Sequence, residues 1–224
     1  MNPLDSPIWN ALSTTHTSFA EGNDVAKRYP FAVTPLAATR DQSAVSYEAL
    51  TKLVGPRERA ALFLETSPLS SPGWNSVHAH LVQMIWDSAF AVPPEDHLVE
   101  VLGVANIQEM LSLAELTKPG PFGRRTPELG SYVGIHDAGH LIAMAGERLR
   151  MPGYTEVSAV CTHPEHRGRG YATLLVSALI NRITNRGETP FLDVRIENVE
   201  AIRVYEKLGF KTRRILNLAI LTRE

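Results

Sequence analysis

A short basic loop with two glycines, His163 to Gly170, constrains the fold of this chain more than any other feature. It follows the apolar segment 157–162, which indicates a buried strand. It precedes residues 170–185, whose apolar positions recur at helical spacing. Bare backbone amides at the start of such a helix can hold an anion, which the helix dipole also favours. The loop therefore predicts an α/β protein with an anion site.

Two arginines within this loop make phosphate the expected anion. Arg167 and Arg169 would supply charged donors that suit phosphate oxygens. The loop is not a P-loop, because the Gly-Lys-Ser/Thr ending is missing, and it does not match the dinucleotide-binding pattern either. A solvated basic turn is the alternative interpretation of a lone Gly-x-Gly. The coincidence of strand, loop and helix favours phosphate.

The charge distribution agrees with a local anion site. The formal net charge is −2, which argues against a general polyanion binder. Residues 1–156 carry 11 Lys and Arg against 17 Asp and Glu, whereas residues 157–224 carry 11 against 7. A nucleic-acid-binding domain is disfavoured because no aromatic stacking platform accompanies the basic loop. We therefore expect no nucleic-acid partner.

Other sequence features indicate a cytoplasmic protein. The single cysteine, Cys161, excludes an intrachain disulfide and is compatible with a reducing compartment. No apolar run approaches the roughly 18–20 residues of a membrane span, and the N-terminus lacks a secretory signal. His163 and His166 flank Glu165 but lack further ligands, so we expect no metal site and no membrane partner.

The chain is expected to form two parts. The segment Val92-Pro93-Pro94-Glu95-Asp96 is the candidate boundary, since two prolines cannot continue a helix or a central strand. Residues 1–92 predict a smaller α/β region with no chemical constellation. Beyond the boundary, the order strand, helix, three strands, helix, strand, helix, strand predicts a mixed sheet with helices on its faces.

Two motifs in register give a family resemblance. Arg167-x-x-Gly170-x-Ala172 resembles the Gln/Arg-x-x-Gly-x-Gly/Ala signature of the GNAT superfamily of N-acetyltransferases. The block from Asn198 through Tyr205 to Phe210 is similar to the family's downstream helix and strand. The resemblance covers roughly residues 97–224, the expected GNAT domain, and residues 1–92 are interpreted as a degenerate second half of the same fold.

The resemblance implies a mixed, mostly antiparallel central sheet flanked by helices, with a splayed parallel strand pair. It implies acetyl-CoA as co-substrate, with main-chain groups of the first splayed strand on the pantetheine arm, loop amides on the pyrophosphate, and Asn198 near the thioester. The implied cofactor-binding residues are Val160, Cys161, Thr162, Arg167, Gly168, Arg169, Gly170, Tyr171, Ala172, Thr173 and Asn198. Cys161 points away from its neighbours in a strand, so we interpret it as a packed small hydrophobe.

Acetyl transfer to an amine needs a neutral amine and a proton for the leaving thiolate. The resemblance implies Tyr205 as the acid, with aromatic packing as its alternative role. It offers Glu156 and Asp193 as the base, since family members carry a carboxylate at either position, and a water chain as a further alternative. Of the two carboxylates, Glu156 is preferred.

The predicted function is an acetyl-CoA-dependent N-acetyltransferase that acts on a primary amine of a small molecule or peptide, by direct attack in a ternary complex. A non-catalytic acyl-CoA-binding or sensing module is the alternative, which would need neither Tyr205 nor a carboxylate. Arg124-Arg125 lies in a loop that borders the acceptor site in this fold, where it would receive an acceptor carboxylate or remain solvated. The acceptor and the oligomeric state do not follow from the sequence.

Overall fold

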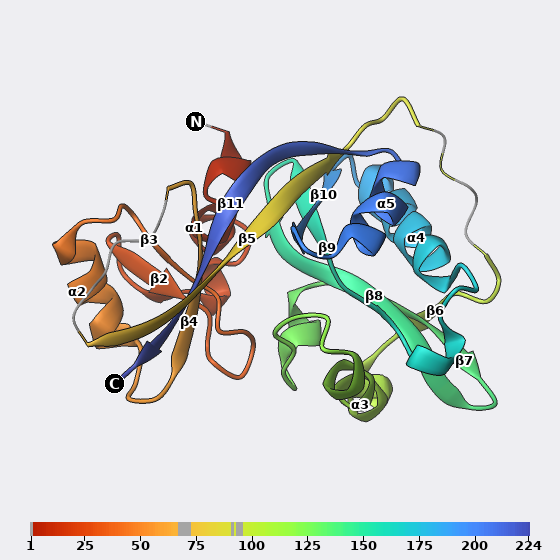
Figure 1. The fold of residues 1–224 in the computed structure, drawn as a ribbon, viewed down its shortest axis with the longest axis horizontal. Helices are drawn as coiled ribbons and strands as arrows, with labels where there is room; N and C mark the ends of the chain where they lie inside the picture. Colours follow the sequence, from red (N-terminus) through yellow and green to blue (C-terminus); the bar gives the residue numbers. More distant parts are fainter. Residues whose placement is uncertain (1, 67–72, 91, 93–95) are drawn as a thin grey trace.

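The computed structural model describes residues 2–66, 73–90, 92 and 96–224. Its main element is an eight-stranded sheet with strand order β4-β11-β5-β10-β9-β8-β7-β6 (Figure 1). Neighbouring strands run antiparallel except for β9 and β10, which are parallel. The expected α/β fold, with its mostly antiparallel sheet and one parallel pair, is confirmed.

The strands of this sheet are β4 (Arg59–Leu64), β5 (Trp74–Trp86), β6 (Glu100–Leu102), β7 (Tyr132–Asp137), β8 (His140–Met151), β9 (Tyr154–Thr162), β10 (Thr189–Arg195) and β11 (Phe210–Arg223). The α-helices are α1 (Pro7–Ser13), α2 (Ala44–Leu53), α3 (Ile107–Thr117), α4 (Tyr171–Asn185) and α5 (Val199–Lys207). A small second sheet contains β1 (Glu21–Gly22), β2 (Ala26–Arg28) and β3 (Ala37–Thr39).

The large sheet continues across the expected domain boundary. Strand β5 precedes position 92, yet it lies between β10 and β11. It pairs with β11 along its whole length, from Trp86 opposite Phe210 to Trp74 opposite Arg223. These two strands run side by side between the two halves of the molecule (Figure 1). Residues 93–95 of the boundary lie outside the described residues, and the division into two folding units stays a prediction.

Helices cover both faces of the sheet. The apolar side chains of α4 pack on one face against β7, β8, β9 and β10, together with Tyr205 of α5. Helix α1 and Tyr29 pack against the other face, at a cluster that includes Phe191 and Leu216. Helix α3 covers that face further along, beneath β8 and β9. In the described residues, no helix has both the length and the apolar character that crossing a membrane requires.

Candidate active site

Strands β9 and β10 separate in the middle of the sheet. Their parallel pairing ends where Phe191 faces Glu156, although both strands continue for several residues. A cavity of about 730 Å³ opens beyond this point, lined by residues 157–162 of β9 and 192–195 of β10. Backbone groups of β9 on this side are therefore not used in a ladder with β10, and an extended ligand can pair with them. The expected splayed strand pair is confirmed.

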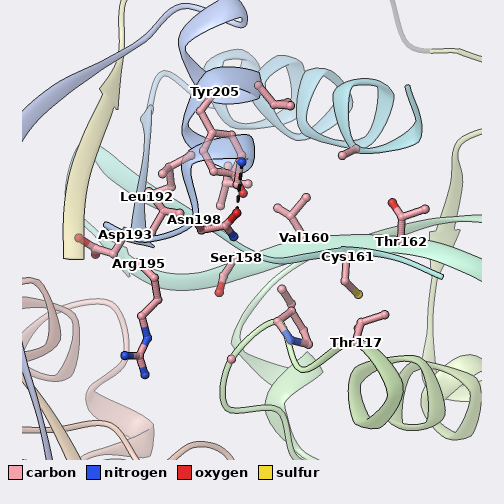
Figure 2. Close-up of a pocket in the computed structure, with 18 of the residues that line it drawn as sticks. Thr117, Ser158, Val160, Cys161, Thr162, Leu192, Asp193, Arg195, Asn198 and Tyr205 are labelled. Atoms are coloured by element: carbon pink, nitrogen blue, oxygen red, sulfur yellow. Dashed lines mark hydrogen bonds between the residues drawn. The ribbon is translucent and has the colours of Figure 1, made fainter. Parts of the chain in front are cut away.

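A bulge in β9 shapes the wall of the cavity. The register with β8 shifts between Met144 and Gly146, because β9 carries one extra residue there, and Ala159 takes a positive φ of 52°. Cys161 then faces α3, where its thiol lies beside Thr117 (Figure 2). Burial raises the pKa of this thiol to about 11, so it is neutral near pH 7. This geometry suits packing rather than nucleophilic chemistry.

The basic loop lies at the end of the cavity where α4 begins. Gly168 and Gly170 adopt positive φ of 75° and 82°, and a Cβ atom at either position would meet nothing within 4 Å. Because Gly170 is the N-cap of α4, no side chain caps the helix. First-turn amides remain available for an anion, while Arg167 is held by a 3.4 Å hydrogen bond from its Nε to the Thr162 carbonyl.

Helix α5 supplies two further side chains to the cavity wall. Asn198 is the N-cap of α5, and its Oδ1 accepts a 3.3 Å hydrogen bond from the Ala201 amide (Figure 2). Tyr205 is only 8% exposed and packs edge-on against Phe210, with ring centroids 6.0 Å apart. Burial raises the pKa of Tyr205 to about 12, so its phenol stays protonated near pH 7. It is therefore able to donate a proton.

The two candidate carboxylates have different surroundings. Asp193 lines the cavity, and neither of its buried carboxylate oxygens has a hydrogen-bond partner among the described residues. Burial raises the pKa of Asp193 well above its usual range, and the nearby Glu156 carboxylate adds to this effect. Figure 2 shows the Asp193 carboxyl group turned away from Tyr205, toward the neighbouring strand β5. The two side chains therefore point in different directions.

Glu156 is fully buried and is not among the residues that line the cavity. Its carboxylate accepts hydrogen bonds from Nε and Nη2 of Arg148, at 2.8 and 2.6 Å, and from the Leu149 amide at 3.3 Å. Burial disfavours the charged guanidinium, but the attraction of Glu156 outweighs it and raises the pKa of Arg148. Glu156 is thus engaged in an ion pair, and Arg148 rather than Glu156 reaches the cavity.

The structure brings most of the sequence-predicted site residues to one cavity. Those that line it are Val160, Cys161, Thr162, Arg167, Gly168, Arg169, Gly170, Tyr171, Ala172, Thr173, Asp193, Asn198 and Tyr205. The Arg124-Arg125 pair is not part of the lining, and Arg125 instead pairs with Glu128 at 2.8 Å. Sequence reasoning missed Arg148 and Arg195, because each lies in a strand with no local motif around it.

The chain is similar to a protein-family model and to solved structures. The family model described as FR47-like protein matches residues 132–217. A solved structure from Novosphingobium aromaticivorans DSM 12444, described as belonging to the GNAT family, is 36% identical with a TM-score of 0.93, and the match covers 100% of both chains. A GCN5-related N-acetyltransferase from Kribbella flavida is 17% identical with a TM-score of 0.65 over 97% of this chain and 93% of its own, a likeness in fold alone.

Curated proteins match over shorter lengths. The N-alpha-acetyltransferase RimI of Mycobacterium tuberculosis is 35% identical over 100 residues, which are 42% of this chain and 60% of that protein. The uncharacterized N-acetyltransferase YobR of Bacillus subtilis is 33% identical over 87 residues, 38% of this chain and 35% of that protein. The matched part of each curated relative is thus less than two thirds of its length.

Proposed function

Since the chain belongs to the GNAT family of acetyltransferases, we propose that it transfers an acetyl group from acetyl-CoA to a primary amine. One observation carries the proposal: the cavity joins the unpaired part of β9 to the uncapped start of α4. An extended pantetheine arm suits the first, and a pyrophosphate suits the second. A cytoplasmic location belongs to the same proposal.

In the proposed binding mode, main-chain groups of Val160 to Thr162 pair with the amides of the pantetheine arm. The amides of Gly168 to Thr173 surround the pyrophosphate, with Arg167 and Arg169 adding charge. Asn198 donates from its side-chain nitrogen near the thioester, since its Oδ1 already caps α5. The glycine positions support this mode, because the space that a Cβ would fill at Gly168 and Gly170 is open to a ligand.

In the proposed reaction, the amine nitrogen attacks the thioester carbonyl, a C–N bond forms and the C–S bond breaks. Asp193 takes the proton that the nitrogen loses, because its raised pKa makes it a stronger base than an ordinary aspartate. Tyr205 gives its proton to the leaving thiolate and recovers one from solvent. We assign the base to Asp193 instead of Glu156, because Glu156 is occupied by Arg148 and lies outside the cavity lining.

Two measurements test the proposal. Isothermal titration should show acetyl-CoA binding at micromolar concentration, and CoA without its 3′-phosphate should retain most of that affinity if the loop binds the pyrophosphate. Release of free thiol, followed with a panel of primary amines, tests turnover. Binding without thiol release for any amine would favour the non-catalytic acyl-CoA-binding module. Absence of acetyl-CoA binding at sub-millimolar concentration would overturn the proposal.

A further inference from the structure

One end of the cavity is apolar and lies away from the phosphate-binding loop. Its wall comes from β4, β5, β11 and the residue that bridges to β4, so strands from both ends of the chain contribute. The members of this apolar wall are Leu36, Ala61, Phe63, Leu81, Leu218 and Ile220. Four of the six precede position 92, in the part of the sequence where no motif pointed to chemistry. These N-terminal residues therefore help to form the candidate site.

Two charged side chains, Arg148 of β8 and Asp193 of β10, line the cavity together with the apolar wall. The Arg148 guanidinium carbon lies 5.8 Å from the centre of the Phe63 ring, and its charge is already paired with Glu156. Asp193 differs, because its buried carboxylate oxygens lack a hydrogen-bond partner in the described part of the chain. On the neighbouring strand β5, one N–H of the Gln83 amide donates to the Leu4 carbonyl at 3.1 Å, and the Gln83 Oε1 accepts from Arg213 at 2.8 Å. A buried carboxylate in this state is stabilised by a ligand that donates hydrogen bonds.

We infer that the apolar wall binds the acceptor, and that the acceptor is a primary amine carried on an apolar group; this inference rests on the proposed acetyltransferase function. The nitrogen of such an acceptor meets Asp193, while its apolar body packs against Phe63 and Ile220. An extended acyl chain on the CoA thioester is the competing occupant of the wall. An acyl chain brings no donor to Asp193, so it leaves the buried carboxylate unsatisfied, whereas an amine satisfies it.

The expected selectivity follows from the apolar area that the wall removes from water. Burial of an aromatic ring stabilises a complex by about 1.5–3 kcal/mol, a factor of roughly 10 to 150 in affinity. Phenethylamine and ethanolamine both offer one primary amine, but only the first carries an apolar body. Phenethylamine should therefore show a KM at least about 10-fold lower than that of ethanolamine, when the two are compared at equal concentrations of neutral amine.

The test uses the full chain with Phe63→Ala and Ile220→Ala as variants. Both side chains are only partly buried, and each variant's thermal unfolding reports whether the fold is kept. Each variant should raise the KM for phenethylamine about 10-fold and leave the KM for ethanolamine unchanged. Ile215→Ala is the matched control, because Ile215 lies in the same strand as Ile220 but is 51% exposed and outside the cavity. Titration of phenethylamine alone onto wild type and Phe63→Ala gives a readout that does not need turnover.

The outcomes separate the inference from the proposed function. Thiol release with equal KM values for both amines overturns the inference while the acetyltransferase function stands. A Phe63→Ala effect on the choice between butyryl-CoA and acetyl-CoA, without an effect on amine selectivity, assigns the wall to an acyl chain and also overturns it. Phenethylamine titration that shows no dependence on Phe63 overturns it as well, whatever the acetyl-CoA titration shows. Failure of acetyl-CoA binding counts against the proposed function alone.

Discussion

Arg148 on β8 holds Glu156 on β9 through two parallel hydrogen bonds of 2.8 and 2.6 Å, in a part of the sheet where both side chains are buried. The contact is possible because β8 carries an irregularity between Glu147 and Arg150, which brings Arg148 opposite the carboxylate. The ion pair lies where β9 and β10 begin to separate. It therefore supports the strand pair at the base of the cavity and orients the guanidinium that the cavity presents.

Glu156→Gln should mainly lower the free energy of unfolding, with a smaller effect on kcat at a saturating acceptor concentration. The variant leaves the buried Arg148 charge without its partner, and loss of one member of a buried pair destabilises by about 3–5 kcal/mol. Asp193 lies near enough to compensate in part, so we expect about 3 kcal/mol in urea unfolding. Glu48→Gln is the control, since Glu48 forms an exposed pair with Lys52 and its loss should change stability by about 0.5 kcal/mol or less. Equal effects of the two variants on the free energy of unfolding would show that the buried pair contributes no more stability than the exposed pair.

Asp193→Asn should lower kcat strongly without lowering the free energy of unfolding near pH 7. We expect kcat to fall about 100-fold or more, because the amide cannot accept the proton. Burial raises the pKa of Asp193, so its contribution to stability is present at low pH and is lost as pH rises through that pKa. Near pH 7 the neutral amide should therefore be as stable as the wild type or more stable, in urea unfolding. Full activity in this variant would leave a water chain as the route for the proton.

The strand, loop and helix around the proposed anion site could be predicted because their signals are local. Gly168 and Gly170 are needed for the backbone itself, and the apolar spacing of α4 marks its buried face. The motif residues of β9, α4 and α5 meet at one cavity because β9 pairs with β10, the strand that precedes α5. The family resemblance implied this pairing.

Side-chain orientation in the strands could not be predicted in the same way. Bulges in β8 and β9 change which face each residue presents, so the sequence did not distinguish the buried Glu156 from the cavity-lining Asp193. The apolar wall was missed for another reason. Phe63 and Leu218 become neighbours through the pairing of β4 with β11, which joins segments more than one hundred residues apart. Neither segment carries a motif that indicates this pairing.

Tyr205→Phe should lower kcat about 100-fold while acetyl-CoA affinity stays within about twofold, because the phenol is proposed to act on the leaving thiolate rather than in binding. Its raised pKa of about 12 keeps the phenol protonated, so this residue should impose no loss of activity at ordinary alkaline assay pH. The measurements are steady-state thiol release and isothermal titration. Tyr154→Phe is the control, since Tyr154 begins β9 but is outside the cavity lining. Unchanged turnover in Tyr205→Phe would reduce Tyr205 to a packing role.

Gly170→Ala should weaken acetyl-CoA binding about 10-fold or more, because the added methyl group would occupy space beside the amides that are proposed to bind the pyrophosphate. Gly139→Ala provides a matched control. Both glycines have a φ of 82° and open space where the alanine methyl group would lie, but Gly139 belongs to the turn between β7 and β8. Each variant should lose about 1 kcal/mol of stability, as expected for a left-handed alanine. Equal acetyl-CoA affinity in the two variants would contradict the proposed phosphate site.

His16 should make the fold sensitive to acid. Its Nδ1 lies 2.8 Å from the Tyr29 hydroxyl, and burial, together with the charge of Arg150, lowers its pKa to about 4. A histidine whose pKa is lower in the folded state contributes stability above its unfolded pKa of about 6.5, and this contribution is lost as pH falls toward 4. The free energy of unfolding should therefore drop by at most about 3 kcal/mol over that window. Urea unfolding at several pH values measures it. His16→Gln should flatten the pH dependence and the exposed His140→Gln should not; a slope that survives His16→Gln would assign the acid sensitivity to other groups.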